Sequence, residues 1–118
     1  MSSPNMTKAY TVTVANGASL SGSSGLFDGA SRALSVATDA AWDTAAITFQ
    51  GSYDGTNFFN LYKEGTEYTI AGVLASTINT IDLSVFMGLR AVKVRSGTSG
   101  AAVNQTGDSV VTLMTTVI

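Results

Sequence analysis

Hydrophobic and polar side chains alternate with a period of two along several short segments of the chain. In residues 10–14, Tyr10, Val12 and Val14 alternate with threonines. In residues 89–96, Val92 and Val94 alternate with Lys93 and Arg95. Because successive side chains of a strand point to opposite faces, this pattern predicts half-buried β-strands. The valines are expected to face the core, and the two basic side chains are expected to face outward.

The richest segment, residues 42–62, contains two apolar runs on either side of Asp54-Gly55. Such a pair between two β-rich runs predicts a hairpin. Alternation places Phe59 and Leu61 on the inward face and Phe58 and Tyr62 on the opposite face. The whole set of side chains predicted to form the core is Trp42, Ile47, Phe49, Phe59, Leu61, Val92, Val94, Val111 and Leu113.

Eight short strands are predicted in total, with no long segment of helical periodicity. They cover residues 10–14, 32–36, two runs within 42–62, 67–70, 77–83, 89–96 and 109–117. Two long connections, residues 16–31 and 97–108, favour a jelly roll over an up-and-down barrel with tight hairpins. The predicted fold is an all-β, single-domain, eight-stranded antiparallel jelly-roll β-sandwich over residues 9–118, preceded by an N-terminal arm, residues 1–8.

The amino-acid composition argues against several classes of function. The chain of 118 residues contains no Cys and no His, so catalytic triads built on His, thiolate nucleophiles and His- or Cys-ligated metals are not available. We therefore expect no enzyme activity, no metal and no cofactor. Charged residues make up only 12% and the net charge is −2, which offers nucleic acid no basic surface. No run has the length and hydropathy of a membrane span or a secretory signal, so no membrane partner is expected.

Two acidic motifs could suggest chemistry. Residues 54–57, Asp-Gly-Thr-Asn, could offer oxygen ligands to a hard cation, but a calcium loop needs further carboxylates at fixed spacing. We interpret this motif as a turn. Asp39 and Asp43 flank Trp42 and could form a glycosidase pair, but nothing in the sequence separates their pKa values. We interpret them as loop acids.

The best candidate site is a protein interface on the outward face of the hairpin. An exposed Phe58 beside Tyr62 is a larger apolar patch than a monomer usually leaves bare. Lys93 and Arg95 share an outward face and are expected to be solvated or to pair with acidic residues of a neighbour. The predicted interface residues are Tyr53, Asp54, Thr56, Asn57, Phe58, Tyr62, Lys93 and Arg95.

Two segments carry a resemblance to a known family. Residues 42–62 read W-x-x-A-A-I-T-F-Q-G-S-x-D-G-x-x-F-x-x-L-Y, and residues 86–98 read F-x-G-L-R-x-V-K-V-R-S-G-T. Both are similar to segments of small capsid-associated proteins of tailed bacteriophages, either decoration (cement) proteins or head-spike bases. The hairpin also resembles that of galactose-binding or discoidin-like jelly rolls.

The phage resemblance implies a structural virion protein without catalytic residues. It implies a capsid decoration or cement subunit that is assembled in the host cytoplasm, binds the major capsid protein on the outer head shell, and stabilises the shell or presents a spike. It also implies self-association, with a homotrimer expected. The alternatives are a carbohydrate-binding β-sandwich module and a tail or neck component. Exposed aromatic side chains with polar partners for sugar hydroxyls would favour the carbohydrate module.

Overall fold

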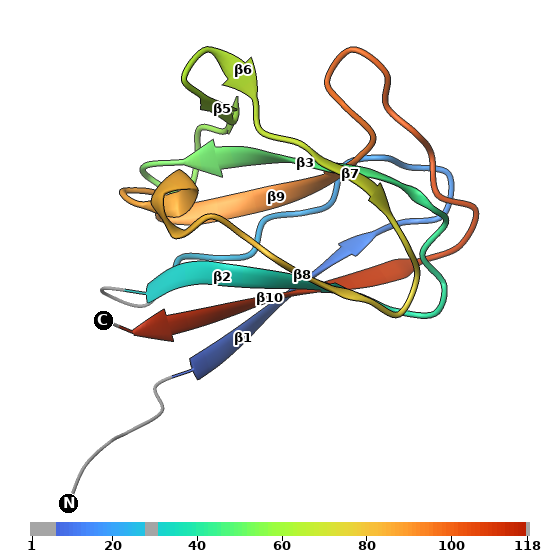
Figure 1. The fold of residues 1–118 in the computed structure, drawn as a ribbon, viewed down its shortest axis with the longest axis horizontal. Helices are drawn as coiled ribbons and strands as arrows, with labels where there is room; N and C mark the ends of the chain where they lie inside the picture. Colours follow the sequence, from blue (N-terminus) through green and yellow to red (C-terminus); the bar gives the residue numbers. More distant parts are fainter. Residues whose placement is uncertain (1–6, 28–30, 118) are drawn as a thin grey trace, which may run out of the picture.

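The computed structural model describes residues 7–27 and 31–117, in which β-strands form two main antiparallel sheets and one small hairpin (Figure 1). The all-β class is therefore confirmed. The described strands are β1 (Thr7–Val14), β2 (Ser31–Thr38), β3 (Ala45–Ser52), β4 (Phe59–Asn60), β5 (Tyr62–Lys63), β6 (Thr66–Glu67), β7 (Ile70–Val73), β8 (Ile78–Thr80), β9 (Ala91–Ser96) and β10 (Ser109–Val117). Between β8 and β9 lies a single 3-10 turn, η1 (Leu83–Phe86), whose N-cap is Asp82.

The described strands number ten rather than the predicted eight. The difference arises between β3 and β8, where the four short strands β4 to β7 replace the two that were expected. Polar residues and Gly65 interrupt the alternation there, so no long strand can form. β1 begins at Thr7, so Thr7 and Lys8 lie in the strand rather than in the predicted arm. The rest of that arm, residues 1–6, lies outside the described residues.

One main sheet has the strand order β1-β10-β2-β8, and the other is built around β3. β3 pairs with β9 on one side and with β4 and β7 on the other. The two sheets face each other in Figure 1, with β2, β10 and β1 below and β3 and β9 above. The strands within each sheet pair antiparallel, and the two facing sheets form the layers of a β-sandwich.

The segment of residues 19–27 lies along the free edge of β9, although its sequence predicted a loop. The backbone N–H of Ser21 donates to the carbonyl of Val94 at 2.8 Å, and that of Ser24 donates to Val92 at 2.9 Å. The two serine hydroxyls also accept hydrogen bonds from the N–H groups of the same valines. Glycine and serine carry no hydrophobic alternation, which is why the sequence pattern missed this edge.

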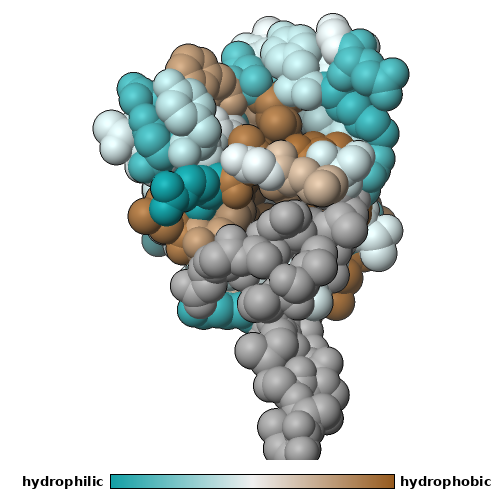
Figure 2. All heavy atoms as spheres, turned by 90° about the vertical axis from the view of Figure 1, so that its left-hand side faces the viewer, coloured by the Kyte–Doolittle hydropathy of each residue, from teal (hydrophilic) through white to brown (hydrophobic). Residues whose placement is uncertain are grey.

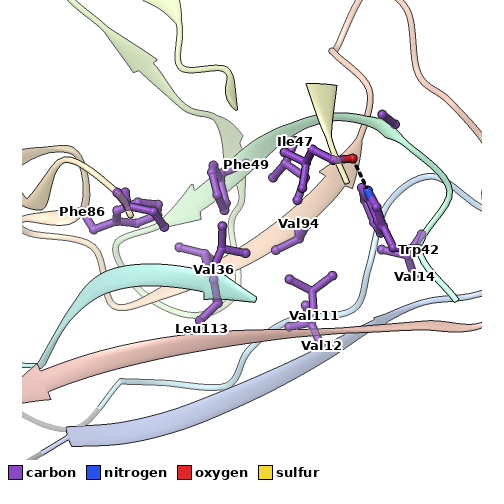
Figure 3. Close-up of a cluster of buried hydrophobic side chains, with 14 of the residues drawn as sticks. Val12, Val14, Val36, Trp42, Ile47, Phe49, Phe86, Val94, Val111 and Leu113 are labelled. Carbon is purple, nitrogen blue, oxygen red and sulfur yellow. Dashed lines mark hydrogen bonds between the residues drawn. The ribbon is translucent and has the colours of Figure 1, made fainter. Parts of the chain in front are cut away.

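Side chains from both sheets meet in one hydrophobic core (Figure 3). Seven of the nine predicted core residues are buried: Trp42, Ile47, Phe49, Val92, Val94, Val111 and Leu113. Trp42 satisfies its indole N–H by donating to the carbonyl of Val73 at 3.1 Å, and Phe49 meets Phe86 edge-on at 5.1 Å. Leu61 is only partly buried against the core.

Phe59 is the predicted core residue that lies in solvent. It pairs with Gly51 and therefore shares the face of Phe49, as alternation required. However, Gly51 stands next to the end of β3, where the chain turns away, and the Phe59 side chain remains exposed. Phe59 therefore lies on the predicted face of its strand. Its side chain is exposed because the β3–β4 pair extends beyond the region that the opposite sheet covers.

In the part of the chain that the structure describes, no helix is long and apolar enough to cross a membrane.

Candidate functional site

Two exposed aromatic rings stand together where β3 ends and β4 begins. Tyr53 is 62% exposed and Phe59 is 57% exposed, and their rings stack nearly parallel, 7° apart, with centroids at 6.1 Å. Leu26, also exposed, reaches the same turn: its Cδ2 lies 2.7 Å from the point where a Cβ on Gly55 would stand. We call Leu26, Tyr53 and Phe59 the aromatic end. Figure 2 views this end of the sandwich, where hydrophobic atoms come to the surface among hydrophilic ones.

The turn that carries the aromatic end is held by its own polar side chains. The Asp54 carboxylate accepts hydrogen bonds from the backbone N–H groups of Thr56 and Asn57, both at 2.8 Å, and from the Asn57 side-chain amide at 2.7 Å. The Ser52 hydroxyl donates to Asp54 and accepts from the N–H of Gly55. Residues 54–57 form a turn, as interpreted from the sequence, and the Asp54 oxygens are used within it. The connection between β3 and β4 is longer than a tight hairpin on Asp54-Gly55, because β3 ends at Ser52 and β4 begins at Phe59.

The backbone conformation of Gly55 favours glycine. Its φ is +84°, a left-handed conformation that side chains rarely adopt. The end of the exposed Leu26 side chain also lies close to the point where a Cβ would stand. The glycine therefore lets the turn close and lets Leu26 pack over it. Together with the Asp54 hydrogen bonds, this fixes the backbone on both sides of the aromatic rings.

The hydrogen bonds from Asn57 and Thr56 lower the pKa of the Asp54 carboxyl well below its ordinary value of 3.8. A group whose folded-state pKa is lowered stabilises the fold above its unfolded pKa, and this contribution disappears as the pH falls through the folded value. We therefore expect the turn to remain closed at pH values well below 3.8. NMR titration of the Thr56 and Asn57 amides measures this, with urea-unfolded protein as the reference. A midpoint at or above the unfolded value would contradict the hydrogen-bonded turn.

The structure separates the predicted interface residues into groups. Tyr53, Asp54, Thr56 and Asn57 share the turn just described. Phe58 is half-buried, because Lys93 lies over its ring with Nζ 4.6 Å from the centroid. Tyr62 is exposed, but it belongs to the separate β5–β6 hairpin, whose Glu64-Gly65 turn has positive φ at both residues.

Two residues of the aromatic end were not among the predicted interface residues. Phe59 was assigned to the core, and Leu26 lies in the 16–31 connection, where no interface residue was predicted. Its neighbour Phe27 is buried and meets Tyr10 edge-on at 4.9 Å, whereas Leu26 is exposed. In an extended segment adjacent residues point to opposite sides, and this signal could have separated the two.

Arg95 is not an outward, solvated side chain, which corrects its predicted role at an interface. It is only 8% exposed, and its guanidinium lies 3.2 Å from the Glu67 carboxylate and donates to Asn60 at 2.7 Å. Arg95 does lie on the face of β9 opposite the core, but Asn60 and Glu67, from β4 and β6, cover it there. Glu67 also accepts from the N–H of Ser99, which ties the 97–108 connection to the same cluster.

The aspartates beside Trp42 hold backbone together, in agreement with their interpretation as loop acids. Asp39 accepts hydrogen bonds from the N–H groups of Ala41 and Val110. Asp43 accepts from both the hydroxyl and the N–H of Thr106, and these bonds lower its pKa. No group of three or more Asp and Glu side chains that could hold a metal ion occurs within residues 7–27 and 31–117.

Gln105 is a structural residue that the sequence analysis missed. Its side chain is fully buried, donates to the carbonyl of Asp43 and the hydroxyl of Ser96, and accepts from the N–H of Asp43 at 2.7 Å. Its backbone bonds to residues 17 and 18. Gln105 thus joins the 97–108 connection to the start of β3 and the end of β9 through its side chain, and to the turn after β1 through its backbone.

A comparison with solved structures finds a protein of similar fold. The chain is similar to the crystal structure of the SPBc2 prophage-derived protein YomS, with a TM-score of 0.51 and 16% identical residues. The similarity covers 98% of this chain and 99% of that one. No protein-family model matches the sequence, and no curated protein sequence matches it. At this level of identity, the similarity concerns the fold.

Proposed function

We propose that the protein is a structural virion subunit of a tailed bacteriophage that decorates the outer head shell and stabilises it. One observation carries the proposal: the stacked, exposed Tyr53 and Phe59 rings stand on a rigid turn within residues 42–62. The same segment resembles capsid-associated phage proteins. The fold similarity to a prophage-derived protein, which extends over nearly the full length of both chains, supports the same origin.

We also infer that the sandwich is a jelly roll of eight strands. If residues 19–27 are taken as one strand, and β4 to β7 as one interrupted strand, each sheet has four members. The orders are then β1-β10-β2-β8 and 19–27-β9-β3-(β4/β7). This alternation of strands between two sheets is the order of a jelly roll, an architecture common in viral capsid domains.

The aromatic end has the physical properties of a protein-docking site. Aromatic side chains bring a large contact area with few rotatable bonds, so they dominate the affinity of many interfaces. Since the turn is already closed by Asp54 and Ser52, little conformational entropy is lost when a partner binds. The exposed Asp54, Thr56 and Asn57 lie beside the rings and provide a polar rim. We assign the major capsid protein as its partner.

Attachment to a shell also explains how such a small site could suffice. A head shell repeats one surface many times, and a self-associated subunit that engages several copies at once binds far more tightly than each contact alone. A homotrimer, assembled with the particle in the host cytoplasm, is the form that we propose. The presence of this chain in purified particles, measured by mass spectrometry, tests the proposal.

Replacing both Tyr53 and Phe59 by alanine is expected to reduce the amount of protein in purified particles at least tenfold, since truncating a central aromatic residue of an interface often costs about 2 kcal/mol or more. Both side chains are exposed, so the variant should melt close to the parent. Tyr62→Ala is the matched control, because it removes an exposed tyrosine outside the aromatic end. Equal incorporation of the double variant and the parent would contradict the assigned site.

A neutral sugar is the second candidate ligand, since exposed aromatic rings also stack on sugars. Binding of a defined glycan, lost in the same double variant, together with absence from particles, would favour the carbohydrate-binding module. Presence in tails rather than heads would favour the tail or neck alternative.

A further inference from the structure

A second exposed apolar surface lies where β7 and β8 form free edges of the two sheets. β7 pairs only with β3, and β8 pairs only with β2, among the described strands. In Figure 1 the connection between them lies at the end of the sandwich opposite to the turn after β3. Leu74 and Ile78, on this connection and at the start of β8, are 57% and 67% exposed. We call residues 70–80 the β7–β8 edge.

The β7–β8 edge carries no charge. Residues 68–81 contain neither acidic nor basic side chains, in a chain that has fourteen such residues elsewhere, six basic and eight acidic. Sheet edges expose backbone donors and acceptors that can pair with another chain, and monomeric proteins usually protect them with charged residues or proline. Neither is present on this edge, whose strands are short, and Leu74 and Ile78 add apolar area to it. An apolar, uncharged edge of this kind is suited to contact with another chain.

The connection within this edge is held rigidly by the core beneath it. The Thr38 hydroxyl donates to the carbonyl of Leu74 at 2.7 Å and accepts from the N–H of Thr77. The N–H of Ser76 donates to the carbonyl of Asp39 at 3.0 Å, and Ser76 has a φ of +55°, which is uncommon for a residue other than glycine. The surface is therefore ordered before any partner arrives, so little conformational entropy opposes its burial.

We propose that the β7–β8 edge binds a second copy of this chain. Symmetry brings a surface close to its own copies, so any charge near the axis meets its like and opposes association. An uncharged surface avoids this repulsion. It also lacks the charges by which a surface selects an oppositely charged partner of another kind. The edge thus favours self-association, with Leu74 and Ile78 of neighbouring copies packed around the symmetry axis.

The proposal rests on the self-association proposed above and locates its contact on the sandwich, and it requires no capsid. The aromatic end and the β7–β8 edge lie at different places on the sandwich, so one subunit can use both at once. Two exposed apolar side chains form a small interface, which predicts weak association in solution. On a repeating shell, the same contact would be strengthened by multivalency.

Sedimentation velocity of the purified full chain over a range of concentrations tests the proposal. The parent is expected to self-associate as its concentration rises, and Ile78→Lys is expected to weaken association at least tenfold by bringing like charges to the axis. Met87→Lys is the matched control, because it adds the same charge at another exposed apolar residue outside the edge and should associate like the parent. A parent that stays monomeric, or an Ile78→Lys variant that associates like Met87→Lys, would overturn the proposal.

A second measurement does not depend on an added charge. The chain has no cysteine, so Ile78→Cys would introduce its only thiol. Under mild oxidation this variant is expected to form disulfide-linked pairs much faster than Met87→Cys at equal concentration. Equal rates for the two variants would place the contact elsewhere, whether or not the chain binds capsids.

Discussion

Replacing Phe49 by alanine is expected to lower the free energy of unfolding by about 3–5 kcal/mol. Phe49 is fully buried at the centre of the sandwich, where it contacts Phe86 edge-on and stacks on Tyr68 at 6.2 Å. Removal of the ring leaves a cavity between the two sheets. The lost transfer free energy of the buried ring and the lost packing contacts around the cavity therefore add together. That is a large share of the roughly 5–15 kcal/mol that stabilises a typical domain.

Chemical denaturation followed by the fluorescence of Trp42 measures this loss, because Trp42 is the only tryptophan and belongs to the same core. Phe59→Ala is the control, since it makes the same chemical change at a phenylalanine that is 57% exposed. It should shift the unfolding free energy by less than about 1 kcal/mol. If the two variants were equally stable, the assignment of Phe49 to the core and Phe59 to the surface would be wrong.

Replacing Arg95 by alanine is expected to destabilise the fold by roughly 3 kcal/mol, because it leaves the Glu67 carboxylate with no cationic partner in a nearly buried position. The Arg95 and Glu67 side chains are only 9% and 14% exposed. The change also removes the hydrogen bond to Asn60, which links β9 to β4. The segments that cover Arg95, β4 and β6, should therefore become more mobile as the free energy of unfolding falls.

A double-mutant cycle separates these contributions. Glu67→Gln removes the charge but keeps a polar side chain, so combining it with Arg95→Ala should recover part of the loss. Lys63→Ala is the matched control: Lys63 approaches Asp82 at 2.6 Å, but both side chains are more than 40% exposed. Exposed ion pairs contribute about 1 kcal/mol or less. An Arg95→Ala variant no less stable than Lys63→Ala would contradict the buried pair.

The alternation of side chains was enough to predict the class of the fold and most of the core. Val92 and Val94 on β9, and Val111 and Leu113 on β10, are buried as their spacing required. Alternation assigns a residue to a face, but it does not say where the opposite sheet ends. For that reason, it assigned Phe59 to the correct face of the sheet and yet predicted the wrong exposure.

Arg95 shows a second limit of the same kind. Its predicted outward face was correct, but Asn60 and Glu67, thirty-five and twenty-eight residues away in the sequence, cover that face. Contacts between such distant segments leave no local pattern. The hydrogen-bonded residues 19–27 were missed for a different reason, since Ser21 and Ser24 join β9 through backbone and hydroxyl groups rather than through buried apolar side chains.

The candidate site was predicted in part. The Asp54-Gly55 turn and the exposed Tyr53 follow from local sequence, since Asp and Gly favour a tight turn whatever surrounds them. The other two residues of the aromatic end do not follow from local sequence. Leu26 reaches Gly55 from the segment along β9, and Phe59 stacks on Tyr53 from the far side of the turn. A site made by segments that meet only in the folded sandwich requires the structure.

Rebinding to stripped heads tests the proposed function most directly. Purified protein is mixed with phage heads that lack accessory proteins, and the bound copies are counted by quantitative mass spectrometry after sedimentation. The account predicts saturable binding at a fixed number of copies per head, lost when Tyr53 and Phe59 are both replaced by alanine and retained in Tyr62→Ala. A chain that remains in the supernatant at every concentration, while it binds a defined sugar, would contradict it.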